Sequence, residues 1–222
     1  MFTHIDFHQL FLLIVPLVFA VTIHEYGHGY AAFKLGDDTA SRAGRLTLNP
    51  LKHMDPFGSF ILPLLLKLTG SPILFGYAKP VPVNFSKLRP RRAGTMIVSA
   101  AGIAANLACA FLSGAIFRIL ILSDSWGSGF GYSPILMDVM KMLEYSVIIN
   151  CVLAIFNMIP IPPLDGSKIF AMLLPSTMRT AYFKLERFGI VILMILIISG
   201  SGFFRTIMVF FLEPLANFFL GV

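Results

Sequence analysis

The sequence predicts an all-α polytopic membrane protein with about five to six transmembrane helices. Of its 222 residues, 57% are hydrophobic and only 13% are charged, whereas a soluble domain is nearer half apolar and a quarter charged. The mean hydropathy is +0.83. The 22 phenylalanines and 11 methionines cannot all be buried in one water-soluble core of this size. Long uncharged runs of about 20 residues instead span a bilayer as helices.

The expected transmembrane helices follow one another within a single integral-membrane domain, residues 1–222. The two middle runs are uncharged over a length that spans a bilayer. Arg205 separates the last two runs, and Glu213–Pro214 interrupts the final one, so this helix either spans or lies against the bundle. The approximate ranges are 8–34, 93–120, 139–159, 188–204 and 206–220.

The segment at about 57–84 is expected to be re-entrant or β-like rather than a full span. Its apolar part, Phe57 to Leu68, is short for a crossing and contains Pro63 and Lys67. The following stretch, Lys79 to Asn84, is expected to be extended, because each proline biases its predecessor towards β or polyproline geometry.

Basic residues predict how the chain is oriented in the membrane. Lys and Arg number four in residues 34–52, five in 79–92 and four in 168–187, whereas 123–138 contains two aspartates and no Lys or Arg. Because cytoplasmic loops carry an excess of basic residues, the three basic loops are expected on the cytoplasmic side of a cell membrane. The net charge of +6 is then a property of these loops, and nucleic acid is not an expected partner.

The motif HExxH, residues 24–28, carries the expected chemistry. Residues i and i+4 lie one above the other on a helix, so His24 and His28 can bind one zinc ion while Glu25 reaches the metal-bound water. In the alternative interpretation, these side chains are satisfied among neighbouring helices. Three ionisable groups within one membrane turn are costly, however, which favours the metal site.

A catalytic zinc site needs a third protein ligand, and Asp165 is the strongest candidate. It follows Asn157 and three prolines that must end the preceding helix, where Asn157 could satisfy freed backbone groups. By the charge pattern, Asp165 and His28 reach the same face of the membrane. The alternative is an ordinary turn residue in Leu-Asp-Gly.

These residues resemble the site-2 protease family of intramembrane zinc metalloproteases, in its compact prokaryotic branch without a PDZ or nucleotide-sensing domain. HExxH and the run from Asn157 to Gly166 match the two motifs of that family, and the segment from Gly36 to Gly58 also resembles this branch. The resemblance implies the following roles: one Zn²⁺ per chain bound by His24, His28 and Asp165, with Glu25 as general base.

The resemblance also implies a substrate and a place of action. The expected reaction is hydrolysis of a peptide bond in transmembrane-helix substrates near the cytoplasmic side, as in regulated intramembrane proteolysis. The expected partners are such a membrane protein and the lipid bilayer. The stretch Lys79–Asn84 is a candidate strand for pairing with an unwound substrate, or an ordinary proline-rich loop.

Two further residues have several possible roles. The G-P-x-x-N patch of the family has a counterpart without the proline at Gly102–Asn106, which implies that Asn106 directs its amide at the substrate carbonyl or oxyanion. The small residues around it also suit close helix packing, and the two roles are compatible. His53 could cap the site, touch substrate, take the fourth position on zinc, or hydrogen-bond a loop.

Two competing functions remain at this level. One is a zinc-binding membrane protein or transporter without hydrolytic activity, and the other is a zinc hydrolase acting on lipid-like or small substrates. Transporters often show internal repeats with paired broken helices, but HExxH and the proline-rich break each occur once. Glu25 favours an enzyme, since zinc binding alone does not require it.

Overall fold

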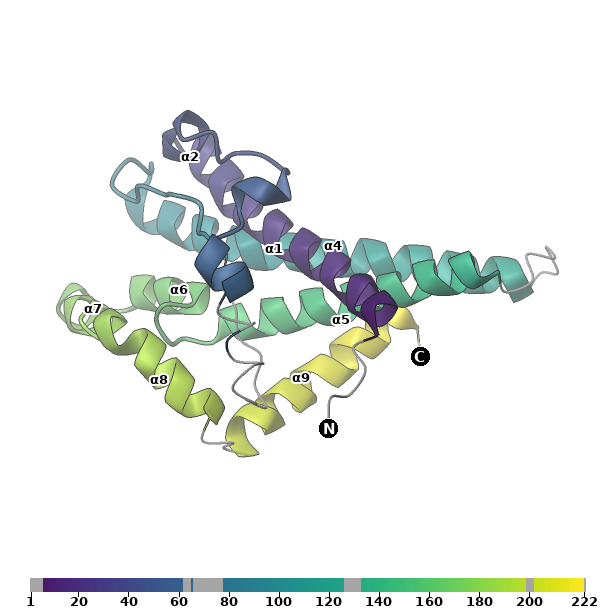
Figure 1. The fold of residues 1–222 in the computed structure, drawn as a ribbon. Helices are drawn as coiled ribbons and strands as arrows, with labels where there is room; N and C mark the ends of the chain where they lie inside the picture. Colours follow the sequence, from purple (N-terminus) through teal and green to yellow (C-terminus); the bar gives the residue numbers. More distant parts are fainter. Residues whose placement is uncertain (1–5, 62–64, 66–77, 126–132, 199–201, 222) are drawn as a thin grey trace.

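The computed structural model describes residues 6–61, 65, 78–125, 133–198 and 202–221, and its regular structure there is entirely helical. Three long helices form the centre of the molecule, and shorter helices gather at one end and along one side (Figure 1). The α-helices are α1 (Phe7–Lys34), α2 (Thr39–Arg42), α4 (Arg91–Ser125), α5 (Pro134–Met158), α6 (Asp165–Leu173), α7 (Ser176–Phe183), α8 (Glu186–Ile198) and α9 (Gly202–Leu220).

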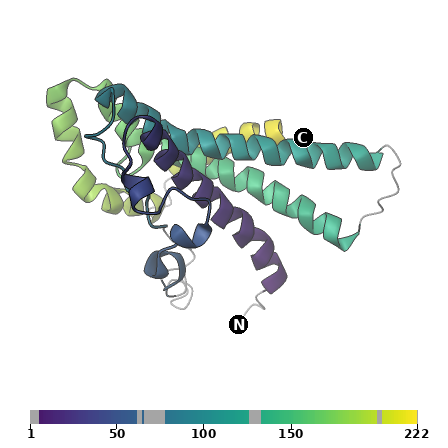
Figure 2. The same cartoon turned by 90° about the horizontal axis from the view of Figure 1, so that it is seen from above.

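The helices α1, α4 and α5 contact one another pairwise, and Figure 2 shows them converging towards the end of the molecule where α6 lies. Within the described ranges these three are long and apolar enough to cross a membrane. The shortest of them, α5, has 25 residues and is therefore about 37 Å long, which exceeds the roughly 30 Å hydrocarbon core.

The prediction of five to six transmembrane helices was too high for the described part of the chain. The run expected at 188–204 includes 199–201, which lie outside the described residues; its described part up to Ile198 belongs to α8, whose 13 residues extend about 20 Å. The run expected at 206–220 folds within α9. The apolar part of this helix, Val209–Leu220, is shorter than a candidate span. Hydropathy alone did not show where these two helices begin and end.

One face of α1 packs inside the bundle and the rest faces outwards. Leu12, Pro16, Ala20 and His24 are buried at intervals of four residues, which places them on one stripe of the helix. Large apolar side chains such as Phe11 are exposed on the remaining surface, as expected of a helix that faces lipid. The buried stripe leads directly into the HExxH motif.

The two ends of the bundle differ in what they contain. At one end, His8 Nε2 lies 2.9 Å from Asp138 Oδ2, so the beginnings of α1 and α5 meet. At the other end, Arg92 Nε donates to the Met172 carbonyl at 2.6 Å, which ties the beginning of α4 to α6. The HExxH residues and Asp165 belong to this second end.

The segment expected to be re-entrant or β-like is described only in part. Pro56–Ile61 forms a π-helix, residues 62–64 and 66–77 lie outside the described residues, and 78–84 has no regular secondary structure. Its backbone groups bond to side chains and a loop instead of a strand: Lys79 N donates to the His53 carbonyl at 2.9 Å, and Asn84 N donates to Asp37 Oδ2 at 2.6 Å. The expected β-like character was therefore wrong for 78–84.

Candidate metal centre

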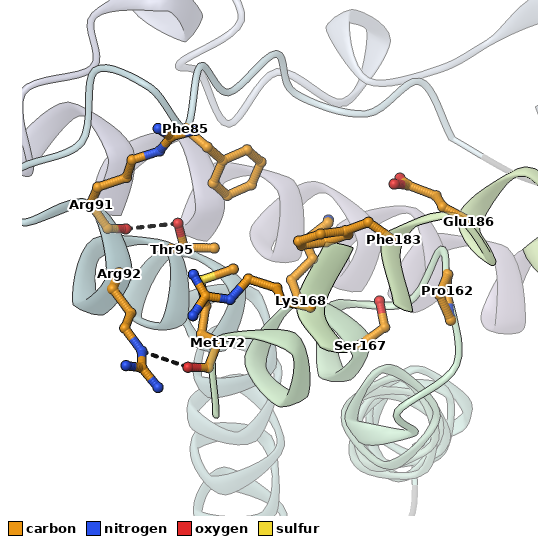
Figure 3. A pocket seen from close by; sticks show the side chains of 11 residues that line it. Phe85, Arg91, Arg92, Thr95, Pro162, Ser167, Lys168, Met172, Phe183 and Glu186 are labelled. Carbon is orange, nitrogen blue, oxygen red and sulfur yellow. Dashed lines mark hydrogen bonds between the residues drawn. The ribbon is translucent and has the colours of Figure 1, made fainter. Parts of the chain in front are cut away.

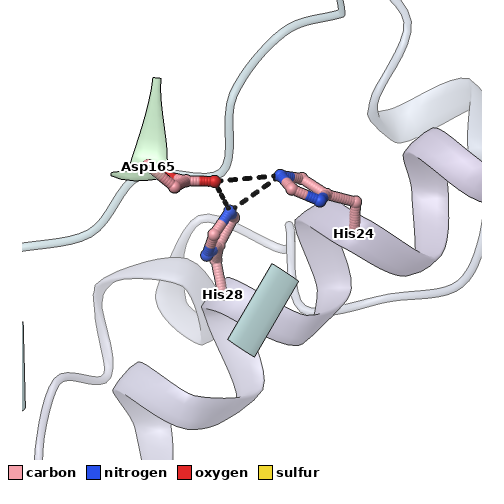
Figure 4. A group of neighbouring side chains, drawn as sticks. All are labelled: His24, His28 and Asp165. Carbon is pink, nitrogen blue, oxygen red and sulfur yellow. Dashed lines mark hydrogen bonds and ion pairs between the residues drawn. The ribbon is translucent and has the colours of Figure 1, made fainter. Parts of the chain in front are cut away.

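Three side chains from two distant parts of the chain meet at the end of the bundle (Figure 4). His24 and His28 lie on α1, and Asp165 is the first residue of α6. Asp165 Oδ2 lies 3.1 Å from His24 Nε2 and 2.9 Å from His28 Nε2, and the two Nε2 atoms are 3.0 Å apart. All three residues are largely buried. The structure thus brings together the three predicted ligands.

Two glycines allow this close approach. A Cβ atom on Gly102 would lie 2.5 Å from His28 Nε2, and one on Gly166 would lie 2.2 Å from the Met158 carbonyl oxygen. Real Cβ atoms essentially never come within 3.0 Å of another heavy atom. Gly102, which lies on α4, therefore leaves room for the two imidazoles of α1. Gly166 lets the beginning of α6 pack against the end of α5.

The hydrogen bonds of the other ring nitrogens settle which imidazole atoms face the cluster. His28 Nδ1 lies 2.7 Å from the Val98 carbonyl oxygen, which can only accept, so this nitrogen carries the proton. His24 Nδ1 lies 2.7 Å from Asn106 Oδ1, and the Asn106 amide nitrogen donates to the Ala20 carbonyl at 3.1 Å. His24 Nδ1 is therefore a donor as well.

The cluster has the chemistry of a cation site. With both Nδ1 atoms protonated, a neutral imidazole presents a lone pair at Nε2, so two lone pairs and a carboxylate oxygen converge within 3.1 Å. Such atoms repel one another unless a cation lies between them. Tetrahedral zinc with ligands at about 2.0–2.1 Å separates its ligand atoms by roughly 3.3 Å, close to the spacing observed. The donor set fits zinc.

Asp165 also has a cationic partner. Lys168 Nζ lies 3.1 Å from Asp165 Oδ1, the carboxylate oxygen on the far side from the histidines. The loop before Asp165 is held by Tyr182, whose hydroxyl donates to the Pro160 carbonyl at 2.6 Å. Partial burial raises the pKa of Tyr182, which keeps this donor protonated. Neither contact was foreseen from the sequence.

Glu25 lies beside the predicted ligands in sequence and is held by the segment 78–84. Its Oε2 accepts a hydrogen bond from the Val81 backbone N–H at 2.7 Å. Arg45 holds the same segment, donating to the Lys79 carbonyl at 2.8 Å. The carboxylate of Glu25 is thus placed by a backbone donor from 56 residues away. In the sequence, the prolines on either side of Val81 were the available signal that this segment has a special role.

The other predicted residues are found in ordinary hydrogen bonds. Asn106 is fully buried, and its amide nitrogen also donates to Asn150 Oδ1 at 2.7 Å. His53 Nε2 donates to the Thr47 carbonyl at 2.8 Å and does not belong to the metal-binding group found among the described residues. Asn157 donates to the Leu153 carbonyl in its own helix. The catalytic role of Asn106 and the accessory roles of His53 and Asn157 stay predictions.

Sequence reasoning missed Asn150 on α5. It is fully buried and joins Asn106 to Ser146, whose carbonyl accepts from the Asn150 amide at 2.8 Å. A polar residue within an apolar run is costly at membrane depth unless it has a partner. That argument, applied to the α5 run, was the signal that could have found it.

The fold and the site together define a helical membrane protein with a zinc-type HExxH centre at one end of its bundle. The comparisons with known proteins agree: the chain belongs to peptidase family M50, whose family model matches residues 12–200. The resemblance to site-2 proteases found from the motifs is confirmed, and the protein is a zinc metalloprotease.

Individual relatives carry names of the same kind. The Bacillus subtilis protein "Putative zinc metalloprotease YwhC" is 38% identical over 192 residues, which cover 86% of this chain and 81% of the relative. "Putative zinc metalloprotease Rip2" of Mycolicibacterium smegmatis is 29% identical over 204 residues, covering 90% of this chain and 73% of the relative. Rip2 of Mycobacterium tuberculosis is 29% identical over 191 residues, covering 86% and 68%. No solved structure matches the chain.

Proposed function

We propose that this protease hydrolyses a peptide bond in transmembrane-helix substrates, close to the cytoplasmic side of the cell membrane. The observation that carries the proposal is the convergence of His24, His28 and Asp165 at one end of three apolar helices. A membrane-spanning substrate can reach a site in this position by lateral approach within the bilayer. The basic loops at the same end support the cytoplasmic orientation.

One zinc ion per chain would be held by the two Nε2 atoms and by the Asp165 carboxylate. When bound, zinc lowers the pKa of a coordinated water towards about 7 and polarises the scissile carbonyl. Glu25, one residue after the first ligand, takes the proton of the attacking water and passes it to the leaving amine. The Val81 N–H, 2.7 Å from Glu25 Oε2, holds this carboxylate in place.

The substrate must be locally unwound to be cleaved. An α-helix uses its carbonyl groups in i to i−4 hydrogen bonds, so a scissile carbonyl becomes accessible only in an extended stretch. The segment 78–84 has no regular secondary structure and lies beside Glu25, and it offers a backbone along which such a stretch could align. Among the described residues, this segment is not part of a sheet.

Metal content and peptide cleavage, measured on the same purified proteins, test this function. The wild type is expected to hold about one zinc per chain and to cleave a membrane-spanning peptide in vesicles. His24→Ala and Asp165→Ala should lose the zinc and the activity. Glu25→Gln should keep the zinc and lose activity by about 100-fold or more. His8→Ala, at the opposite end of the same helix, is the matched control and should change neither.

Three outcomes contradict the proposal in different ways. Zinc retained by Asp165→Ala would place the third ligand elsewhere. Full cleavage by Glu25→Gln would remove this residue as the base. A wild type that binds zinc but cleaves a lipid amide, and no membrane-spanning peptide, would replace the substrate class.

A further inference from the structure

A basic cavity lies next to the metal centre (Figure 3). Its volume is about 490 Å³, and α4, α6, α7 and the beginning of α8 contribute to its walls. Figure 3 shows Arg91 and Arg92 on one side of the cavity and Glu186 on another. Lys168 lines it as well, while its Nζ atom contacts Asp165 of the metal centre at 3.1 Å. The cavity and the metal centre therefore share α6.

The charge of the cavity is strongly positive. Four basic side chains line it, against one carboxylate, that of Glu186. Lys168 is paired with Asp165, but within the described part of the chain no ion pair joins a carboxylate to the three arginines of the cavity. These are Arg91, Arg92 and Arg179. This excess of positive charge favours an anion in the cavity.

Two of these arginines are held by main-chain carbonyls, and each has further N–H groups besides the one that makes this hydrogen bond. Arg92 Nε donates to Met172 O at 2.6 Å, and one terminal nitrogen of Arg179 donates to Leu174 O at 3.1 Å. Arg179 Nε is buried and has no hydrogen-bond partner. A buried donor without a partner is unfavourable.

The cavity lies at the level where a membrane surface is expected. Arg91 and Arg92 begin α4, one of the three candidate spans, and basic residues at the end of an apolar span favour the membrane interface. Next to it, α7 has no buried residue, and it exposes the apolar side chains of Met178 and Phe183 beside Arg179. A short helix of this kind suits the boundary between water and lipid.

We propose that this cavity binds the phosphate group of an anionic membrane lipid. Guanidinium groups bind phosphate oxygens in a bidentate manner, and basic pockets between membrane helices recognise lipid head groups. Phe85, Met172 and Phe183 add apolar walls that suit the glycerol and the beginning of the acyl chains. Binding of this kind is independent of peptide hydrolysis, so it can be tested whatever the fate of the proposed function.

Native mass spectrometry of the full-length protein in neutral detergent tests the proposal by titration with phosphatidylglycerol. Arg91→Gln and Arg179→Gln should each raise the apparent Kd about fivefold, since a basic residue near anionic lipid contributes about 1 kcal/mol. Arg187→Gln, an exposed arginine on α8 outside the cavity wall, is the matched control and should change the Kd less than twofold. Arg179→Lys, which keeps the charge, should lie between wild type and Arg179→Gln.

Thermal unfolding of each variant keeps a loss of binding distinct from a loss of fold, and a Kd change counts only at an unchanged midpoint. Equal weakening by all three glutamine variants would overturn the proposal, because it indicates general attraction to the basic surface. So would phosphatidylcholine binding as tightly as phosphatidylglycerol. Displacement of the lipid by equimolar inorganic phosphate would make soluble phosphate the ligand. An acidic peptide that binds where phosphatidylglycerol does not would make the cavity a substrate subsite.

Discussion

His24 and His28 each donate their Nδ1 proton to an oxygen atom on α4, the side chain of Asn106 and the backbone of Val98. These bonds fix the rotation of both rings and direct Nε2 towards Asp165. Partners of this kind usually contribute 10–100-fold to metal affinity or activity. The Val98 carbonyl cannot be changed by substitution, but Asn106 can.

We expect Asn106→Ala to weaken zinc binding by roughly 10–100-fold, because His24 loses the acceptor that orients it. Competition with a chelator of known affinity measures the change. Asn217→Ala, at an exposed asparagine on α9, is the matched control, and its zinc affinity should stay within twofold of wild type. If Asn106→Ala instead binds zinc normally but cleaves substrate slowly, the amide acts on substrate and not on His24.

At the scale of elements, α6 matters because it begins at Asp165, the proposed third metal ligand. Its first residue, Asp165, can reach α1 only because Gly166 packs against the carbonyl of Met158 at the end of α5. The Pro-rich loop before it carries no regular structure, and Tyr182 holds it from α7. The Leu-Asp-Gly sequence is therefore a docking point between α5 and α6 as well as the source of a ligand.

Gly166→Ala should push the beginning of α6 away from α5 and reduce the zinc content of the purified protein to a small fraction of wild type. A Cβ atom there would meet backbone at 2.2 Å, which no side-chain movement can relieve. Elemental analysis measures the effect. Gly44→Ala serves as the control, because Gly44 is exposed and has open space around it. Its φ of +64° means that the alanine variant carries about 1 kcal/mol of backbone strain. Normal zinc content in Gly166→Ala would show that α6 can shift without moving Asp165.

The segment 78–84 is a second element whose position depends on distant partners. Arg45, the His53 carbonyl and Asp37 hold it along its length. Asp37 is completely buried and also accepts from the backbone N–H and the hydroxyl of Thr39. This fixed segment brings the Val81 N–H to Glu25.

Val81→Pro removes the N–H that Glu25 accepts, and we expect it to lower kcat by about tenfold or more while zinc content is unchanged. The reason is that a base about 1 Å out of place can cost on the order of 100-fold in rate. Cleavage kinetics of a membrane-spanning peptide provide the measurement. Val83→Pro, which leaves the Val81 N–H in place, should have the smaller effect. Equal rates for both variants and wild type would remove this segment from the mechanism.

For the whole molecule, the main question is how its ends relate to the membrane. The beginnings of α1 and α5 meet at His8 and Asp138, and the beginning of α4 meets α6 at the opposite end. Three spans arranged in this way alternate in direction. The metal centre, the cavity and the basic loops then share one side.

Cysteine labelling tests this arrangement. Lys52→Cys and Lys184→Cys should react with a membrane-impermeant maleimide only from the cytoplasmic side, and Ser133→Cys only from the other side. The background should be low because both native cysteines, Cys109 and Cys151, are buried. Labelling of all three positions from one side would contradict the alternation of the spans. Reversed sides would place the metal centre at the outer face.

Composition and local pattern by themselves determined the membrane class, the positions of the three long helices and the HExxH pair, because each depends on residues within a few helical turns. The third member of the cluster, Asp165, was predicted from a motif that follows the α5 run. Sequence alone predicted more spans than the three found among the described residues, since hydropathy does not show where a helix begins and ends.

Only the tertiary structure decided how these parts act together. It showed that Asp165 faces His24 from 141 residues away, that Asn106 accepts from His24, that Val81 contacts Glu25, and that the arginines of α4 and α7 share a cavity. The physical reason is that a periodic pattern fixes which face of a helix is buried, but which groups meet across that face depends on how closely the helices pack. Here that closeness depends on single glycines, Gly102 and Gly166.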